Sequence, residues 1–353
     1  MTRPRLAVSI GDPNGIGPEV VLRAAREVRD VDLVAVGSAA VLQAQAQALD
    51  LGPVHVVPTV AATPSGTTGR SAQPAPASGA GEGLAVLDTD AGSDYEWGRT
   101  TAEGGRQAMR AVALACDLVL SGDADGLVTA PISKEAIGLA GYDAPGHTEF
   151  LQARTGAETV VMVLAAELPA GPLRVALVTI HVPVAAVAGL VTAERIDRVC
   201  RTLADALRAD LGIAAPRLAV LGLNPHAGDG GVIGRQEIDV IGPALDALRA
   251  DGVSVDGPFP ADAFFGRAAW RRADAVVAMY HDQGLAPFKA LAQGAGVNVT
   301  LGLPIVRTSP DHGTAFDVAG QGVADPSSTV AAVRLAAQMA RRRAQAARAS
   351  QSG

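Results

Sequence analysis

The sequence predicts a two-domain protein of the α/β class. Three short apolar runs, residues 174–180, 218–223 and 275–279, have the length and composition of buried strands. Each run stops abruptly at a group of polar residues, as strands of open α/β sheets do where they present ligand-binding side chains. The chain has 353 residues, which is too long for one core of ordinary size, so two domains are expected.

The N-terminal half contains further strands and helices separated by turn residues. Residues 6–10 should form a strand, and the loop after it should feed a helix, with Pro18 at a first helical position and Glu19 at the positive end of the helix dipole. A plain strand-to-helix turn would account for this loop equally well. The same patterns predict a strand at 31–37, a helix at 101–115, a strand at 126–132 and a helix from 133 onward.

The C-terminal half continues the alternation of strands and helices. We expect residues 162–166 and 174–180 to pair as a hairpin across the turn at 167–172. Helices are predicted at 192–209, 240–250 and 334–350, and a Pro/Gly turn at 257–262. Residues 61–83 are rich in Ala, Pro, Ser, Gly and Thr, which indicates a mobile surface insertion.

Composition excludes several classes of function. The formal net charge of −7 argues against nucleic acid or an anionic membrane as a partner. Cys116 and Cys200 share no motif, which favours buried thiols in a reducing cytosol over a disulfide framework. The apolar region 160–191 is interrupted by charged residues and prolines, and the N-terminal apolar run is too short for a signal peptide. A soluble cytoplasmic protein is therefore expected.

A histidine follows each of the three short apolar runs. His181, His226 and His281 lie just beyond the runs that end at residues 180, 223 and 279. Three histidines are a common ligand set for Zn²⁺ or a related divalent ion with a position left open for substrate. A single histidine after a strand is more often a surface or hydrogen-bonded residue, so the prediction rests on the threefold repetition of the pattern.

Two other segments carry candidate anion-binding residues. His147 and Thr148 lie in Gly-His-Thr-Glu-Phe at the expected head of a helix, where backbone N–H groups bind phosphate or carboxylate readily. Thr148 acting only as an N-cap is the alternative. Further along, Lys289 and Arg307 could bind an anion, with Asn298 between them, although such side chains often lie on solvated faces.

Some familiar motifs are missing from the sequence. It contains no Gly-x-Gly-x-x-Gly and no P-loop, so a nicotinamide cofactor would not use the ordinary Rossmann phosphate turn. It also lacks a Gly-x-Ser-x-Gly elbow, which disfavours a serine hydrolase.

Seven segments together resemble the 4-hydroxythreonine-4-phosphate dehydrogenase family. They are, in chain order, GDPNGIGPEV, TAPISKEAI, GHTEFL, GLNPHAGDGGVIGRQEID, GPFPAD, YHDQGLAPFK and VNVTLGLPIVRTSPDHGTAFDVAG. GDPNGIGPE and DHGTAFDVAGQGVADP are also similar to segments of the isocitrate and isopropylmalate dehydrogenases. The resemblance implies a two-domain α/β/α fold of that type with the active site in the cleft between domains. We place the first domain at 1–130 plus 285–353 and the second at 131–284.

The resemblance also implies roles for individual residues. The three strand-end histidines, His181, His226 and His281, would bind one divalent ion (Zn, Mg or Co) in a site completed across a homodimer interface. Substrate would be bound by His147, Thr148, Lys289, Asn298 and Arg307. By analogy with the decarboxylating dehydrogenases, the loop of Asp311, His312, Gly313 and Thr314 would contact the adenosine half of NAD or NADP.

The implied reaction is the oxidation of the C3 hydroxyl of 4-phosphooxy-L-threonine by NAD⁺. The 3-keto acid then loses CO₂ to give 3-amino-2-oxopropyl phosphate, a precursor of pyridoxine 5′-phosphate. Lys289 is expected to transfer the proton, because a nearby bound cation would lower its pKa. Asp262 and Asp282 are expected to support the histidines by hydrogen bonding.

Several alternatives stay open from the sequence. Related enzymes oxidise D-threonate or D-erythronate 4-phosphate, or a dihydrodiol of an aromatic dicarboxylate. The motif containing His147 and Thr148, together with Lys289 and Arg307, favours a phosphorylated substrate over the dihydrodiol. A hydrolase or aldolase could use three histidines and a metal ion without NAD, and a non-catalytic binding protein could share the scaffold.

Overall fold

The computed structural model describes residues 3–57, 83–90, 92–144 and 146–351. The predicted insertion at 61–83 lies outside this range except for Gly83. The chain divides into two compact units. Unit 1 contains Met1–Ala157 and Leu303–Ala344, and unit 2 contains Glu158–Gly302 and Gln345–Gly353.

The unit boundaries differ from the ones that we expected at 130 and 284. Residues 131–157 group with unit 1, because α4 (Lys134–Leu139) and α5 (His147–Thr155) contact α3 (Ala102–Leu120). Residues 285–302 group with unit 2, because α10 (His281–Ala292) and β11 (Val297–Leu301) contact β6 (Val161–Leu168).

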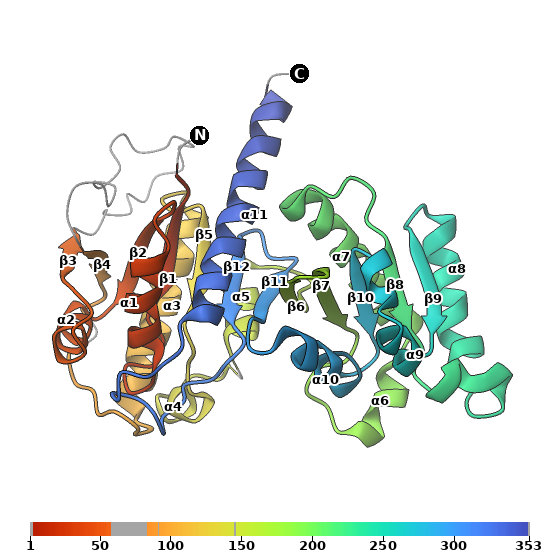
Figure 1. Cartoon of the computed structure of the whole chain (residues 1–353), viewed down its shortest axis with the longest axis horizontal. Coiled ribbons are helices and arrows are strands. Elements are labelled where there is room, and N and C mark those ends of the chain that lie inside the picture. Colours follow the sequence, from red (N-terminus) through yellow and green to blue (C-terminus); the bar gives the residue numbers. More distant parts are fainter. Residues whose placement is uncertain (1–2, 58–82, 91, 145, 352–353) are drawn as a thin grey trace. The chain divides into compact units, whose positions relative to one another are not determined.

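Unit 1 contains a parallel sheet. Its strand order is β3 (Val54–Val57), β4 (Leu84–Asp88), β2 (Asp32–Gly37), β1 (Arg5–Ser9), β5 (Gly126–Thr129) and β12 (Arg307–Pro310). Its helices are α1 (Gly17–Glu27), α2 (Ala39–Ala48), α3, α4, α5 and α11 (Ser327–Gln351) as far as Ala344 (Figure 1). β5 and β12 are buried at every residue, so both faces of these strands are covered.

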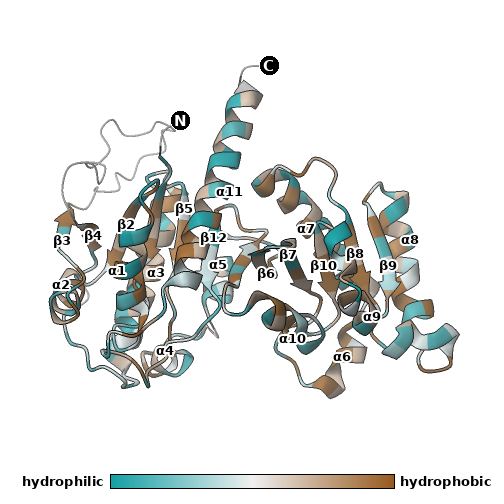
Figure 2. Ribbon diagram, in the orientation of Figure 1, coloured by the Kyte–Doolittle hydropathy of each residue, from teal (hydrophilic) through white to brown (hydrophobic). Residues whose placement is uncertain are grey.

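Unit 2 contains a mixed sheet. Its strand order is β11, β6, β7 (Gly171–Leu177), β10 (Ala275–Ala278), β8 (Leu218–Leu221) and β9 (Val255–Phe259). The β6–β7 hairpin is antiparallel, as the sequence predicted, and β7, β10, β8 and β9 run parallel. Figure 2 shows the central strands of this unit coloured as hydrophobic, which agrees with their burial.

The remaining elements of unit 2 are helical. The α-helices are α6 (Val184–Leu190), α7 (Ala193–Leu211), α8 (Gly242–Ala250), α9 (Ala261–Gly266) and α10. Three shorter turns complete the unit: 3₁₀ turns η1 (Pro225–Gly231) and η3 (Ala269–Arg272), and a π-turn η2 (Glu237–Ile241). Within the described residues, no helix is both long enough and apolar enough to cross a membrane.

One predicted element was wrong. The expected Pro/Gly turn at 257–262 is instead the end of strand β9 followed by helix α9. Among the described strands, β9 is the last in the order, and proline is tolerated on such an edge because its missing N–H is not needed by a second neighbour. Pro258 therefore lies in a strand and does not mark a turn.

Candidate active site

The three predicted strand-end histidines of unit 2 follow three neighbouring strands. His181 comes shortly after β7, His281 after β10 and His226 after β8, and these strands are adjacent and parallel in the order β7-β10-β8. Carboxyl ends of parallel strands lie on one edge of a sheet. The structure thus places all three histidines beyond the same edge, although the chain order of the strands differs from their spatial order.

Two of these imidazoles lie close together. The ring centroids of His181 and His281 are 5.6 Å apart, and the planes are tilted by 43°. Asp282 Oδ1 lies 2.7 Å from His281 Nδ1, which is within hydrogen-bonding distance, so this carboxylate can orient the ring. With Nδ1 donating to this carboxylate, Nε2 keeps its lone pair for a cation.

The third histidine is not part of this pair. His226 is exposed on turn η1 with a left-handed backbone φ of 54°. In the described part of the single chain, no group of three or more His, Cys, Asp or Glu side chains is placed to hold a metal ion. The donors fit a divalent ion chemically, because two imidazoles lie close together, but one chain brings together only two of the three predicted ligands.

A buried arginine marks a second cluster, in unit 1. Arg307 is the first residue of β12, is 2% exposed, and donates from Nη2 to Thr129 Oγ1 at 2.7 Å. Burial lowers its pKa to about 10, an effect that Glu149 partly offsets, so the guanidinium stays charged at neutral pH. Taking such a charge out of water costs several kcal/mol, which an anionic ligand would offset. No pattern in the sequence singles out Thr129.

His147 lies in the same cluster at the head of α5. Burial is the largest cause that holds its pKa well below the ordinary value, and the positive charge of Arg307 acts in the same direction. His147 is therefore neutral at pH 7. Its Nε2 atom is buried and has no hydrogen-bond partner among the described residues. The other ring nitrogen, Nδ1, donates to the backbone of Ala130, so Nε2 of the neutral ring is an acceptor. Nε2 could donate to an anion only after the ring takes up a proton.

Thr148 does not cap the helix, so the alternative explanation for this motif is excluded. Gly146 is the N-cap of α5, and no side chain accepts a hydrogen bond there. Thr148 lies within the first turn. The N–H groups of that turn have no side-chain cap, and they add to the positive potential near His147.

The predicted cofactor loop of unit 1 follows β12. Asp311 N donates to Ser328 Oγ at 3.0 Å, and Thr314 O accepts from Ile16 N at 2.9 Å. His312 Nδ1 lies 3.0 Å from Gly313 O, and its buried Nε2 has no hydrogen-bond partner among the described residues. This loop therefore presents polar atoms and is fixed at both ends.

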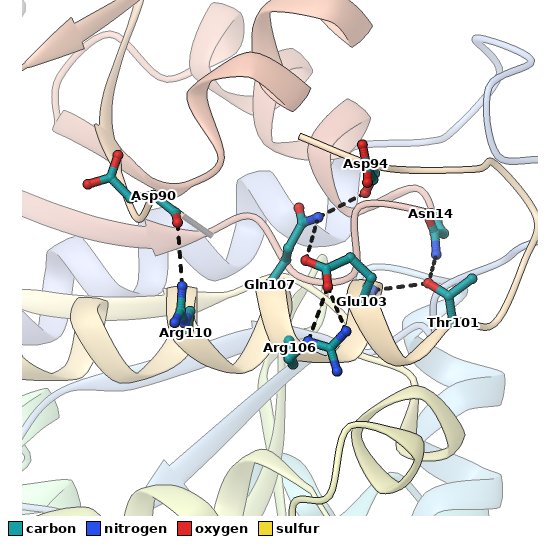
Figure 3. A network of polar contacts seen from close by, with 9 residues as sticks. Asn14, Asp90, Asp94, Thr101, Glu103, Arg106, Gln107 and Arg110 are labelled. Carbon is teal, nitrogen blue, oxygen red and sulfur yellow. Dashed lines mark hydrogen bonds and ion pairs between the residues drawn. The ribbon is translucent and has the colours of Figure 1, made fainter. Parts of the chain in front are cut away.

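The loop after β1 contacts the predicted cofactor loop, so it is more than a plain turn. A Cβ on Gly15 would lie 2.7 Å from Thr314 O, so only glycine allows this approach. Asn14 Nδ2 donates to Thr101 Oγ1, the cap of α3, at 2.9 Å (Figure 3). In addition, Glu96 N donates to Asn14 Oδ1 at 2.7 Å. Asn14 therefore joins this loop to the start of α3.

Asp12 in this loop gives a testable dependence of stability on pH. The side chain is fully buried, and burial raises its pKa from 3.8 to about 6 despite a hydrogen bond from Asn14 N. The folded state thus binds more protons than the unfolded chain between these values, and the free energy of unfolding falls as pH rises through this window. The loss from this residue should approach about 3 kcal/mol.

Urea unfolding of the protein and of its Asp12→Asn variant measures this loss. The variant keeps an acceptor for Asn14 N but cannot ionise. At each pH we compare the free energy of unfolding of the variant with that of the original protein. This difference should shift in favour of the variant by about 3 kcal/mol between about pH 4 and about pH 8. An equal difference at both pH values would contradict the prediction.

The other predicted residues of unit 2 lie on α10, α9 and β11. Lys289 is exposed on α10, two turns beyond His281 and so about 12 Å further along the helix axis. Asp262 is exposed in the first turn of α9, a helix that contacts η1 with its His226. Asn298 lies on β11, and its buried Oδ1 has no hydrogen-bond partner among the described residues.

Comparisons with known proteins agree over almost the whole chain. A family model described as pyridoxal phosphate biosynthetic protein PdxA matches residues 29–336. The chain is 47% identical to a 4-hydroxythreonine-4-phosphate dehydrogenase of Chromobacterium violaceum, covering 96% of this chain and 97% of that protein. It is 46% identical to the protein of the same name from Caulobacter vibrioides, covering 97% and 99%.

Solved structures give the same result. A 4-hydroxythreonine-4-phosphate dehydrogenase from Klebsiella pneumoniae superposes with a TM-score of 0.81 at 37% identity, covering 96% of this chain and 98% of that one. A terephthalate 1,2-cis-dihydrodiol dehydrogenase from Burkholderia xenovorans is more distant, with a TM-score of 0.64, 29% identity and coverage of 95% and 98%. The chain belongs to the family of the pyridoxal phosphate biosynthetic protein PdxA.

Proposed function

We propose that the protein oxidises 4-phosphooxy-L-threonine with NAD⁺ and releases 3-amino-2-oxopropyl phosphate and CO₂. The observation that carries this proposal is its identity of 47% with a 4-hydroxythreonine-4-phosphate dehydrogenase over 96% of the chain. The buried guanidinium of Arg307 beside His147 supports a phosphorylated substrate. The two cysteines are buried and free, which fits a reducing cytoplasm.

The substrate phosphate is assigned to the cluster of unit 1. Arg307 would bind the phosphate with two N–H groups, and Thr148 would donate from the first turn of α5. His147 would donate from Nε2 once the negative charge of the phosphate raises its pKa and the ring takes up a proton. Lys289 and Asn298 are also assigned to substrate binding. The buried Oδ1 of Asn298 has no hydrogen-bond partner among the described residues and could accept one from the substrate, and the long side chain of Lys289 is exposed.

The divalent ion, which is Zn, Mg or Co in this proposal, is assigned to His181, His226 and His281. A second copy of the chain would complete this site, since one chain brings only two of the rings together. Large exposed hydrophobic residues follow two of these histidines in sequence, with Val184 80% exposed and Val232 85% exposed. These side chains are compatible with burial against the second subunit of a homodimer.

The chemistry divides between bound groups and residues. A divalent ion would supply charge stabilisation at the substrate oxygen, and NAD or NADP, bound at Asp311–Thr314, would accept hydride from C3. Lys289 would take the hydroxyl proton. Loss of the carboxylate as CO₂ leaves an electron pair at C2 that takes up a proton. Arg307 and His147 hold the phosphate during both steps, and Asp262 and Asp282 orient the histidines that would bind the ion.

NADH formation from 4-phosphooxy-L-threonine tests the proposal directly. The assay is run beside D-threonate and D-erythronate 4-phosphates, before and after treatment with a chelator. Rapid, chelator-sensitive turnover of the amino-acid substrate alone is the expected result. Turnover of only a sugar-acid phosphate would keep the dehydrogenase chemistry and remove the role in vitamin B6 synthesis. Absence of NADH with all three substrates would contradict the proposal.

A further inference from the structure

The turn that carries His226 has an unusual backbone. From His226 to Gly231 every residue has a positive φ, with values of 54°, 52°, 82°, 46°, 62° and 96°. Three of these residues, His226, Ala227 and Asp229, have a side chain, and left-handed geometry costs about 1–2 kcal/mol for each. Such strain persists only where neighbouring groups determine the path of the chain, and it is common at functional sites.

Glu237 is the group that determines this path. The residue is 5% exposed, and its Oε1 accepts from Leu223 N at 2.7 Å and from Asn224 N at 2.8 Å. Its Oε2 accepts from Asn224 Nδ2 at 2.9 Å. A Cβ on Gly228 would lie 2.7 Å from the same Oε2, so the carboxylate also fills the space inside the turn. Glu237 thus contacts the chain on both sides of His226.

Gln283 connects this loop to the one that carries His281. Its Oε1 accepts from Met279 N at 2.7 Å, at the end of β10, and its Nε2 donates to Gly222 O at 2.6 Å, at the end of β8. A similar contact reaches the loop of His181, because Thr179 Oγ1 donates to Met279 O at 2.7 Å. Side-chain hydrogen bonds therefore join all three strand ends that precede the histidines.

We infer that Glu237 and Gln283 are positioning residues that hold the histidine loops of each subunit in place and thereby set the affinity of the shared site for a divalent ion. Neither residue is a proposed ligand of the ion. Glu237 holds the strained turn of His226, and Gln283 fixes that turn relative to the start of α10, where His281 lies. This inference rests on the proposed metal-binding role of the histidines.

Titration of metal-free protein with Co²⁺ against a competing chelator tests the inference. Gln283→Met keeps the length of the side chain and removes both hydrogen bonds. Glu237→Gln keeps one acceptor oxygen but turns an amide donor toward the Asn224 amide. Each variant should bind Co²⁺ about 10–100-fold more weakly, as losses of such supporting contacts do. The visible spectrum of bound Co²⁺ should also change, because it depends on ligand geometry.

Two controls separate positioning from general effects on the fold. Gln43→Met on α2 and Glu167→Gln on β6 make the same chemical changes at exposed positions and should leave Co²⁺ affinity unchanged. Thermal unfolding of each metal-free variant shows that it is folded. If either folded variant, Gln283→Met or Glu237→Gln, binds Co²⁺ with the original affinity and spectrum, its positioning role is wrong. His281→Ala tests the premise that the histidines bind the ion. Unchanged Co²⁺ affinity in that variant would remove the proposed metal role.

Discussion

Replacing His281 with alanine is expected to abolish turnover while leaving the fold intact. His281 is the member of the histidine set that lies both 5.6 Å from the ring of His181 and within hydrogen-bonding distance of Asp282. Its loss leaves one ring of the close pair. A divalent ion contributes several kcal/mol to stabilising charge in the transition state, and each 1.36 kcal/mol is tenfold in rate, so kcat should fall by roughly a thousandfold or more.

The fold should tolerate this change because the side chain of His281 is only partly buried, with 38% of its surface exposed. NADH formation is measured together with circular dichroism and the elution volume on size-exclusion chromatography. The matched control is His55→Ala, an exposed histidine on β3 in unit 1, which should keep full activity. Full activity of His281→Ala would show that the histidine set does not bind a catalytic ion.

The placement of these histidines could be predicted because it depends on local patterns. Apolar runs that end in His-Val-Pro, Asn-Pro-His and Tyr-His-Asp fix both the strand and its boundary. Which of the three strands lie next to each other in the sheet could not be predicted in the same way. The order β7-β10-β8 is set by packing between distant parts of the chain, and nothing in the three runs indicates which strands become neighbours.

Other features depended on tertiary context and were missed for that reason. Pro258 suggested a turn, but an edge strand accepts proline. The left-handed conformation of His226 is held by Glu237, which lies outside the turn of His226, so no local pattern indicates it. Arginine is usually exposed, so a sequence pattern cannot indicate that Arg307 is 2% exposed.

The burial of Arg307 leads to a second prediction with a large effect. Arg307→Met should raise KM for the phosphorylated substrate and lower kcat/KM by about a hundredfold or more, because truncating one member of a buried charge pair costs about 2–5 kcal/mol. KM for NAD⁺ should change little, since the cofactor is assigned to a different loop. Initial rates with each substrate varied separately measure the two KM values. The control Arg110→Met changes an exposed arginine on α3 and should leave both unchanged (Figure 3).

We also expect Arg307→Met to be at least as stable toward unfolding as the original protein. The structure buries the Arg307 guanidinium beside Thr129 and near a neutral His147, and an apolar side chain of similar length would avoid the cost of desolvating that charge. Replacing buried charges with well-packed apolar groups is often neutral or stabilising by about 1–4 kcal/mol. Urea unfolding without substrate should therefore find Arg307→Met at least as stable as the original protein, although it binds substrate poorly. A large loss of stability with unchanged KM would instead assign Arg307 to the core and move the phosphate site elsewhere.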